Sequence, residues 1–330
     1  MASTADRPLY FSFFMFTANL QPGDRDYART IARHMQALRE FGYAGFDLPI
    51  APPAAELDAA RDLGAYEELR GALDDAGLSD VRLTTNVAAT RTFNISSPFA
   101  EQRALGLAYL RSRVEITRAL RGDAMAGPIV IPYGVFPTTD AGQPIWSDAL
   151  QQWLAPRYKH AQPELEKLGE FAAELNVKVA IEPVDHWETP SPNLVGDVAG
   201  ILDGVASTQV GVCIDSAHVV LGAEGLDAFT ASVAKSTGRI HYVHISAPDR
   251  GAVKGSWIPW QQFLKTVLPV YEGPLLVEVF NAIPVFQNPL RLTRRKFWIP
   301  GEDEPVAGWP DAYTVAREGL AEVRAQLASL

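Results

Sequence analysis

Residues 212–221 read VCIDSAHVVL: an apolar run with the length of a strand ends on Asp215, and His218 follows three residues later. A carboxylate left unpaired at the end of a buried strand is strongly destabilising, because it loses its hydration and gains nothing in return. Asp215 therefore needs partners. The rest of the chain indicates which fold would bury this aspartate and which groups would surround it.

Short apolar runs alternate with longer amphipathic stretches along the chain, which is the pattern of a parallel sheet built from βα units. Helical periodicity is clearest in residues 27–42, 99–122 and 162–176. Strands are expected at Leu9–Thr17, Tyr43–Leu48, Asp80–Val87, Pro128–Pro132, Val177–Glu182, Val210–Asp215, Ile240–Ile245 and Leu275–Phe280. Eight strands, each followed by helix, in a chain of 330 residues predict an α/β fold, a closed (β/α)₈ TIM barrel forming one domain over residues 1–330.

Two segments are longer than a minimal barrel needs. Residues 131–160 follow the fourth expected strand, and residues 281–311 follow the eighth; both are rich in proline, glycine and aromatic residues. We expect them to be extended βα loops on the C-terminal face, where barrel active sites lie. The alternative is that they decorate the surface or form an oligomer contact.

Composition and charge exclude several classes of function. The hydrophobic share of 47% and charged share of 21% are those of a globular protein, and the net charge of −10 disfavours nucleic acid as a partner. No apolar run approaches the length of a membrane span, and residues 9–16 (LYFSFFMF) are interpreted as a buried strand instead of a secretion signal. The single cysteine, Cys213, suits a reducing cytoplasm and is expected to be buried packing, not a nucleophile.

Asp215 is one of four similar residues. Glu182, His244 and Glu278 also stand at or near the ends of expected strands, and the four follow one another at intervals of 33, 29 and 34 residues. One βα unit of a barrel occupies about 31 residues. The spacing therefore predicts that the four side chains lie at similar heights on neighbouring strands and point to one spot.

Three carboxylates that converge on one imidazole repel one another unless a cation holds them. This set of oxygen and nitrogen ligands suits Mn²⁺ best, with Mg²⁺ or Co²⁺ as alternatives, and fits a structural zinc site poorly. For each residue alone the alternative is a salt bridge or hydrogen bond at the barrel rim. For the four together we predict a divalent metal site.

With these residues assembled, the chain resembles the xylose-isomerase-like TIM barrel superfamily of sugar isomerases and epimerases, and within it the ketose 3-epimerase branch. The resemblance is carried by IEPVDHWE (181–188), IDSAH (214–218), VHISAPDRG (243–251), KGSWIPW (254–260) and VEVF (277–280). Xylose isomerase proper has a lysine just after the glutamate of the fifth strand, where this chain has Val184 and Asp185. The endonuclease-IV branch needs a histidine-rich zinc site and a basic groove, which six histidines and a charge of −10 do not favour.

The resemblance implies a role for each matching position. Glu182 and Glu278 would be metal-binding acid/base residues, and Asp215 and His244 the other two metal ligands. The implied substrate contacts are Glu188, His218 and Arg250. From the residues themselves, His186 in the loop after the fifth strand and Tyr133 and Asn281 at strand exits are further candidates for the substrate pocket, whereas His34 and His160 are expected at the surface and His241 is expected to be packed.

The implied chemistry is removal of a proton next to the carbonyl of a keto-sugar through a metal-stabilised enediolate, with ketose 3-epimerisation as the foremost reading. The alternative is β-elimination from a 3-keto-glycoside, because the long aromatic loops also resemble the catalytic subunits of C-glycoside deglycosidases. Dehydration, aldose–ketose isomerisation and a non-catalytic sugar-binding module remain open as well. The expected partners are a small keto-sugar or keto-glycoside, and a second copy of the chain or, for the deglycosidase reading, a small accessory subunit. Aromatic candidates for an aglycone site are Trp153, Tyr158, Trp187, Trp257, Trp298 and Phe286.

Overall fold

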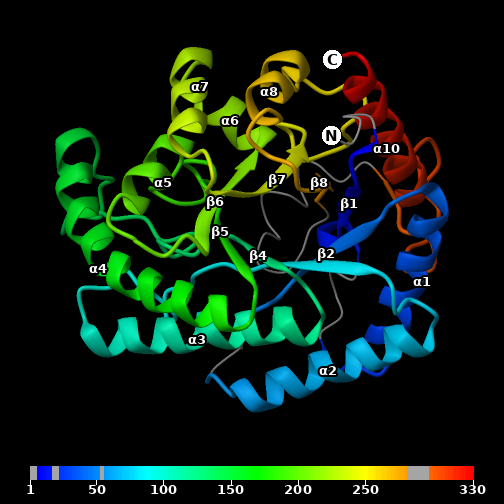
Figure 1. Cartoon of the computed structure of the whole chain (residues 1–330), viewed down its shortest axis with the longest axis horizontal. Helices are drawn as coiled ribbons and strands as arrows, with labels where there is room; N and C mark the ends of the chain where they lie inside the picture. The colour runs from blue at the N-terminus through cyan, green and yellow to red at the C-terminus, as the bar shows by residue number, and fades with distance from the viewer. Residues whose placement is uncertain (1–5, 17–21, 53–55, 281–296) are drawn as a thin grey trace.

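The described part of the chain contains a closed barrel of eight parallel strands in chain order, with helices arranged around it (Figure 1). The computed structural model describes residues 6–16, 22–52, 56–280 and 297–330. The strands are β1 (Leu9–Ser12), β2 (Gly45–Pro49), β3 (Arg82–Asn86), β4 (Ala124–Gly127), β5 (Lys178–Ile181), β6 (Val210–Asp215), β7 (Ile240–Ser246) and β8 (Leu275–Glu278). The predicted (β/α)₈ fold is therefore confirmed.

The helices bury apolar stripes against the outside of this barrel. In the first helix the buried residues include Ile31, Met35 and Leu38, which share one face because they are four and then three positions apart. Burying a side chain of this kind is worth about 1.5–3 kcal/mol. The helices are α1 (Tyr27–Phe41), α2 (Ala59–Asp75), α3 (Ala100–Ala119), α4 (Ser147–Glu174), α5 (Val195–Leu202), α6 (Ser216–Gly222), α7 (Leu226–Lys235), α8 (Trp260–Val267) and α10 (Ala312–Ala328), with the short 3₁₀ helix η2 (Phe13–Met15). None of the helices in the described ranges combines the length and the apolar character needed to cross a membrane.

The prediction for the fourth strand is wrong. The strand expected at 128–132 lies one segment earlier, in the Ala-Met-Ala-Gly stretch of β4, and the backbone leaves the ladder at Gly127, whose φ is +130°. A side chain there would collide with the backbone oxygen of Val87, since an added Cβ would lie 2.2 Å from it. The apolar run after β4 is buried as irregular chain. Apolar character located a buried segment, but it did not distinguish this short strand from the more apolar chain that follows it.

The long segment after β4 is only partly a loop. Its second half, from Ser147 on, is the start of α4, which continues through Pro156 and Pro163. Each interior proline removes a backbone hydrogen bond and disfavours a helix by about 3 kcal/mol. The buried stripe of Leu154, Ala161, Leu165, Leu168 and Ala172 is the compensating factor. Two aromatic residues expected in this loop, Trp153 and Tyr158, therefore lie on a helix. Of the segment after β8, residues 281–296, which include Asn281 and Phe286, lie outside the described residues.

One histidine expected at the surface is buried instead. His34 on α1 stacks on Phe16, and its two ring nitrogens lie 2.8 Å from the Tyr313 hydroxyl and 2.7 Å from a carboxylate oxygen of Glu302. The partners Glu302 and Tyr313 come from the end of the chain, which returns to cover α1. A second contact joins the two ends of the sequence: Arg324 on α10 donates a hydrogen bond to the backbone oxygen of Arg7.

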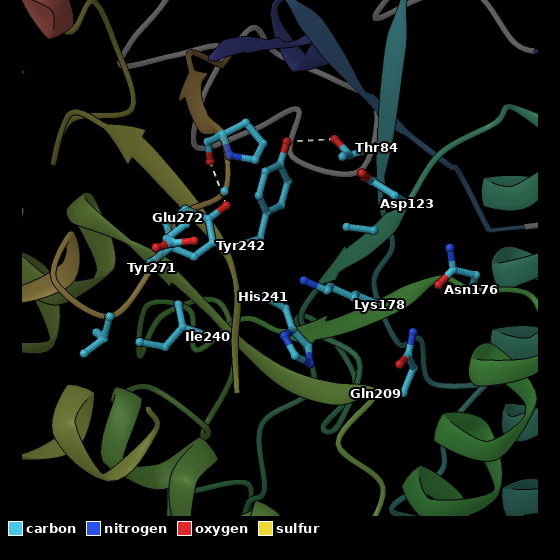
Figure 2. A pocket seen from close by; sticks show the side chains of 14 residues that line it. Thr84, Asp123, Asn176, Lys178, Gln209, Ile240, His241, Tyr242, Tyr271 and Glu272 are labelled. Atoms are coloured by element: carbon cyan, nitrogen blue, oxygen red, sulfur yellow. Dashed lines mark hydrogen bonds between the residues drawn. The ribbon is translucent and has the colours of Figure 1, made fainter. Parts of the chain in front are cut away.

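The barrel interior has a packed central layer. Tyr10 and Tyr242 fill its centre together with the small side chains of Ala126, Ala180 and Cys213. Tyr242 forms a hydrogen bond with Thr84, at 2.8 Å between the two hydroxyls (Figure 2). Below this layer, at the N-terminal ends of the strands, lies a cavity of about 450 Å³. Above it, at the C-terminal ends, lie the four predicted ligands.

Candidate active site at the C-terminal end of the barrel

The structure brings the four predicted metal ligands together. Glu182 directly follows β5, Asp215 ends β6, His244 lies within β7 and Glu278 ends β8. All four are at least 97% buried. Asp215 is paired with His244 across β6 and β7, whereas Glu278 is paired with a serine two residues beyond His244. The heights are therefore staggered, as the tilt of barrel strands requires, and the side chains converge in spite of it.

The spacing of the four donor atoms fits a divalent cation. Nδ1 of His244 lies 3.1 Å from Oε1 of Glu182, 3.6 Å from Oε1 of Glu278 and 3.9 Å from Oδ2 of Asp215. One donor atom from each residue lies within 4.8 Å of all the others. An octahedral ion with ligands at about 2.1 Å holds neighbouring donors about 3 Å apart. These residues could therefore hold Mn²⁺, Mg²⁺ or Co²⁺ with little rearrangement.

Cys213 lies close to the same cluster, but it is a poor ligand. Its sulfur is within 4.8 Å of donor atoms of Glu182 and His244. Burial raises the pKa of the Cys213 thiol far above its ordinary value, so the thiol keeps its proton. As predicted, this cysteine is buried; it packs with the alanines and tyrosines in the barrel centre.

Arg250 lies among the carboxylates and offsets part of their negative charge. Its guanidinium donates to Oδ2 of Asp215 at 3.1 Å, to the hydroxyl of Ser246 at 2.7 Å and to Oε2 of Glu278 at 2.6 Å. The group also lies over the ring of Phe280, 4.3 Å from its centroid. Ser246 donates in turn to the carboxylate of Asp215 at 2.6 Å. The sequence indicated Arg250, but it gave no signal for Ser246, because a serine inside a strand is ordinary.

Asp215 has a structural task besides its place in the cluster. Its carboxylate accepts hydrogen bonds from the backbone N–H groups of Ala217, at 2.6 Å, and His218, at 3.3 Å, and so caps the start of α6. This answers why a buried strand ends on an aspartate: one oxygen is satisfied by the helix and the other faces Arg250 and His244.

A second group of predicted residues lies beside the cluster. His218 places Nε2 3.7 Å from Oε1 of Glu182 and Nδ1 3.0 Å from Oδ1 of Asp185. Glu188 accepts hydrogen bonds from the hydroxyl of Tyr133, at 2.9 Å, and from the backbone N–H of Asp185, at 3.1 Å. Asp185 was not predicted as a site residue, because its role depends on the fold of the loop that carries it.

His186 lies apart from this group. Its side chain is exposed, and its ring meets the ring of Trp187 edge-on at 5.0 Å between centroids. Trp187 itself is 53% exposed. His186 is therefore on the right loop but at its outer rim, and its contact with a substrate stays a prediction.

Burial and neighbouring charges shift the pKa values of the two glutamates in opposite directions. Burial alone would raise the pKa of Glu182, but His244 and His218 outweigh it and hold that pKa below its ordinary value. Burial also raises the pKa of Glu278, and there Arg250 and His244 do not overcome it, so the value reaches about 8. For His218, burial lowers the pKa, but the charge of Asp215 and the contact with Asp185 raise it to about 9. Two carboxyl groups in one site with separated pKa values can act as a proton acceptor and a proton donor.

The chain is similar to known proteins in sequence and in fold. Residues 35–297 match the sequence profile of the family described as xylose isomerase-like TIM barrel. The chain is 54% identical to a protein of known crystal structure from Anabaena variabilis, with a TM-score of 0.93 over 98% of this chain and 99% of that one. The assignment of that protein as a sugar phosphate isomerase/epimerase is provisional.

Several relatives carry 3-epimerase names. The chain is 22% identical to an L-ribulose 3-epimerase from Methylomonas sp. over 204 residues, which are 61% of this chain and 65% of that relative. The match thus spans less than two thirds of that relative's length. A crystal structure of D-allulose 3-epimerase from Methylomonas sp. has the same fold, with a TM-score of 0.74 at 18% identity over 97% of this chain and 98% of the other.

Proposed function

This chain belongs to the xylose isomerase-like TIM barrel family, and we propose that it is a metal-dependent epimerase that inverts C3 of a ketose. The observation that carries the proposal is the buried cluster of Glu182, Asp215, His244 and Glu278, which supplies two carboxylic acids within 3.6 Å of one imidazole nitrogen. The 3-epimerase names of its relatives support the same reaction class.

The cluster would hold the metal through one donor atom of each residue, with Mn²⁺ foremost and Mg²⁺ or Co²⁺ as alternatives. When bound, the divalent ion would act as a Lewis acid that polarises the substrate carbonyl and so makes the neighbouring C–H group more acidic. Glu182 and Glu278 come from β5 and β8, on the two sides of the pair β6 and β7. They would thus approach the sugar from different sides.

In the proposed reaction one glutamate removes the proton from C3, next to the ketone at C2, and the other glutamate returns a proton to the opposite face. After a forward turnover the acceptor holds a proton and the donor has lost one, which is the starting state of the reverse reaction; exchange of these protons with water restores the pair for another forward turnover. The lowered pKa of Glu182 favours it as the first acceptor, and the raised pKa of Glu278 favours it as the first donor. The expected result is inversion at one carbon with no other change in the sugar.

Orientation of the substrate would be the task of Arg250, His218 and Glu188. Arg250 carries a fixed positive charge at the floor of the site, and His218 and Glu188 offer a donor and an acceptor beside Glu182. Positioning of this kind makes a proton transfer effectively unimolecular. His186 and Tyr133 would contribute at the rim of the pocket, Tyr133 through its hydrogen bond to Glu188.

The second candidate is β-elimination from a 3-keto-glycoside, in which the second acid protonates a leaving group instead of the carbon. The observation in its favour is Trp187, which is half exposed and directly precedes Glu188, where an aromatic aglycone could stack. If elimination is the reaction, we expect a small accessory subunit; if epimerisation is the reaction, we expect a homo-oligomer. Mass measurement of the purified protein in solution distinguishes these assemblies.

The test is proton NMR in D₂O of substrates incubated with the Mn²⁺-loaded protein, with the protein and metal removed before the spectra are recorded. One arm contains D-fructose or D-allulose, and the other a 3-keto-glucoside with an aromatic aglycone. Deuterium at C3 together with the C3 epimer would support the epimerase. Free aglycone with an unsaturated keto-sugar would replace it with the elimination reaction, and a ketose left without deuterium at C3 would refute the epimerase.

A further inference from the structure

The loop between β5 and α5 is rigidly built around Asp185. Its backbone oxygen accepts from the N–H groups of Glu188, at 2.8 Å, and Thr189, at 3.1 Å, which makes one helical turn. The side-chain amide of Asn193 closes the loop by donating to the backbone oxygens of Val184, at 2.7 Å, and Thr189, at 3.1 Å. The position of the Asp185 side chain is therefore fixed by the backbone that carries it.

The Asp185 carboxylate is buried beside the imidazole of His218. It is 2% exposed, and neither of its oxygens has a well-aligned hydrogen-bond donor among the described residues. Nδ1 of His218 lies 3.0 Å from Oδ1, although the ring is turned away from the ideal hydrogen-bond direction. A buried carboxylate without a donor is strongly destabilising, so a small rotation that aligns this N–H is favourable. Contacts in a catalytic site often tighten in this way when substrate binds.

The other end of the imidazole faces the metal ligands. Nε2 of His218 lies 3.7 Å from Oε1 of Glu182, and the whole side chain is 2% exposed. If Nδ1 carries its proton toward Asp185, the ring cannot turn over, and Nε2 is the nitrogen that meets the substrate. The backbone N–H of Asp185 also donates to Glu188 at 3.1 Å. One residue thus fixes the direction of two proposed substrate contacts.

We propose that Asp185 is a positioning residue that holds the Nδ1–H group of His218 and thereby aims Nε2 of that imidazole at the substrate beside Glu182. The effect of Asp185 on catalysis rests on the proposed epimerase function, whereas its contact with His218 does not. Asp185 does not touch the reacting atoms and acts through His218. An aspartate in this position orients a histidine and fixes which nitrogen is protonated, as carboxylates do for histidines in other catalytic sites.

A competing use of the same residues is a second cation site. Asp185, Glu188 and His218 offer donor atoms within 4.8 Å of one another. The two oxygens of Glu188 already accept from the Tyr133 hydroxyl and from the backbone of Asp185, and Nδ1 would have to lose its proton. These contacts favour the Asp185–His218 pair over a metal. The competing site makes a separate prediction, namely a second metal ion per chain.

The first test reads the proton on Nδ1 directly. The full-length chain is labelled with ¹⁵N-histidine, loaded with Mg²⁺, which is diamagnetic, and studied at about pH 10, above the His218 pKa of about 9, so that the ring is neutral and carries one proton. The His218 signals are identified by their loss in His218→Gln. We expect Nδ1 to carry a proton in the wild type and in Asp185→Asn, whose amide oxygen can still accept. In Asp185→Leu, which has no acceptor, Nδ1 should lose this proton.

A matched control separates positioning from general loosening of the loop. The carboxylate of Asp197 accepts from the backbone N–H groups of Asn193, at 2.9 Å, and Leu194, at 3.1 Å, in the same loop. Asp197→Asn should lower the melting temperature and leave the Nδ1 signal of His218 unchanged. If Asp197→Asn and Asp185→Leu alter that signal alike, the effect belongs to the loop and the proposal is wrong.

The second test measures turnover of whichever ketose is active in the D₂O assay. Loss of a residue that orients a site side chain lowers activity by about 10- to 100-fold. We expect a fall of this size in kcat for Asp185→Leu, a smaller change in KM, and partial rescue in Asp185→Asn. An unchanged Nδ1 signal or an unchanged kcat in Asp185→Leu overturns the proposal, as does a second bound Mn²⁺ in calorimetry that Asp185→Asn abolishes. If the wild type turns over no ketose, the epimerase function fails while the NMR test still decides the role of Asp185.

Discussion

Polar side chains line both ends of the barrel, but the charged groups are exposed to water at one end and buried at the other. At the N-terminal end the charged residues Asp123, Lys178 and Glu272 are exposed at the mouth of the cavity (Figure 2). At the C-terminal end the charges of the cluster, Arg250 included, are at least 92% buried and satisfy one another. Water stabilises charge at the first end, and only the protein, or a bound cation, can do so at the second.

Two histidines of β7 show the difference within one strand. His241 is the second residue of the strand, and its Nε2 donates to the backbone oxygen of Thr208 at 2.9 Å. Burial lowers the pKa of His241 to about 4, because a hydrogen bond to a neutral carbonyl does not compensate the charged form. Burial acts on His244 too, but the neighbouring acidic groups, Glu182 and Glu278 among them, raise its pKa well above the ordinary value. A polar cavity alone therefore does not indicate a functional site, whereas converging buried charges do.

The largest effect is expected for the two glutamates. Glu182→Gln and Glu278→Gln should each lower kcat for ketose epimerisation by about 10²- to 10⁴-fold, because each removes a group that accepts or donates the proton at C3. The measurement is deuterium incorporation at C3 in D₂O. Glu272→Gln at the N-terminal cavity is the matched control and should retain wild-type activity. Equal losses at both ends would mean that the comparison between them is mistaken.

The next effect concerns metal binding. Asp215→Asn should reduce Mn²⁺ affinity at least about 100-fold, since even residues that only support a ligand change affinity by about 10- to 100-fold. Isothermal calorimetry on the chelator-treated protein measures this directly. The amide can still cap α6 through its oxygen, so the circular dichroism spectrum should be unchanged. Asp123→Asn should bind Mn²⁺ as the wild type does, and unimpaired binding by Asp215→Asn would remove Asp215 from the ligand set.

The residues that the sequence revealed share a simple geometry. Glu182, Asp215 and Glu278 stand at strand ends, where the direction of the side chain follows from the strand and the position follows from the length of a βα unit. Asp185 and Ser246 could not be found in this way. The contacts of Asp185 depend on the path of the loop after β5, and those of Ser246 depend on the stagger between neighbouring strands. A single sequence determines neither.

The same distinction between local patterns and long-range contacts explains the errors in the predicted fold. The fourth strand, AMAG, has one large apolar side chain among two alanines and a glycine, so its hydrophobicity is weaker than that of the irregular chain behind it. His34 looked like a surface residue because its partner Glu302 is 268 positions away. Local patterns predicted the elements and their order, and contacts over long sequence separations decided the exceptions.

The smallest expected effect is on stability at the N-terminal end, and it depends on pH. His241 has a pKa of about 4 in the folded protein and about 6.5 in the unfolded chain, so the unfolded state binds more protons as the pH falls. Stability is therefore fully present above pH 6.5 and is lost between pH 6.5 and 4. At pH 5 the loss from this one group is about 2 kcal/mol.

Asn is the matched replacement because its amide can also donate to the backbone oxygen of Thr208, yet it does not titrate. Urea unfolding of the wild type and His241→Asn at pH 7.5 and pH 5 measures the difference. The free energy of unfolding of the wild type should fall by about 2 kcal/mol more than that of the variant, because the other titrating groups are common to both. Lys178 and Arg239 lie close enough to lower the pKa of His241 further, so added salt should reduce the effect. An equal pH dependence in both proteins would show that His241 is hydrated in the folded state, and the contrast between the two histidines of β7 would then be much weaker.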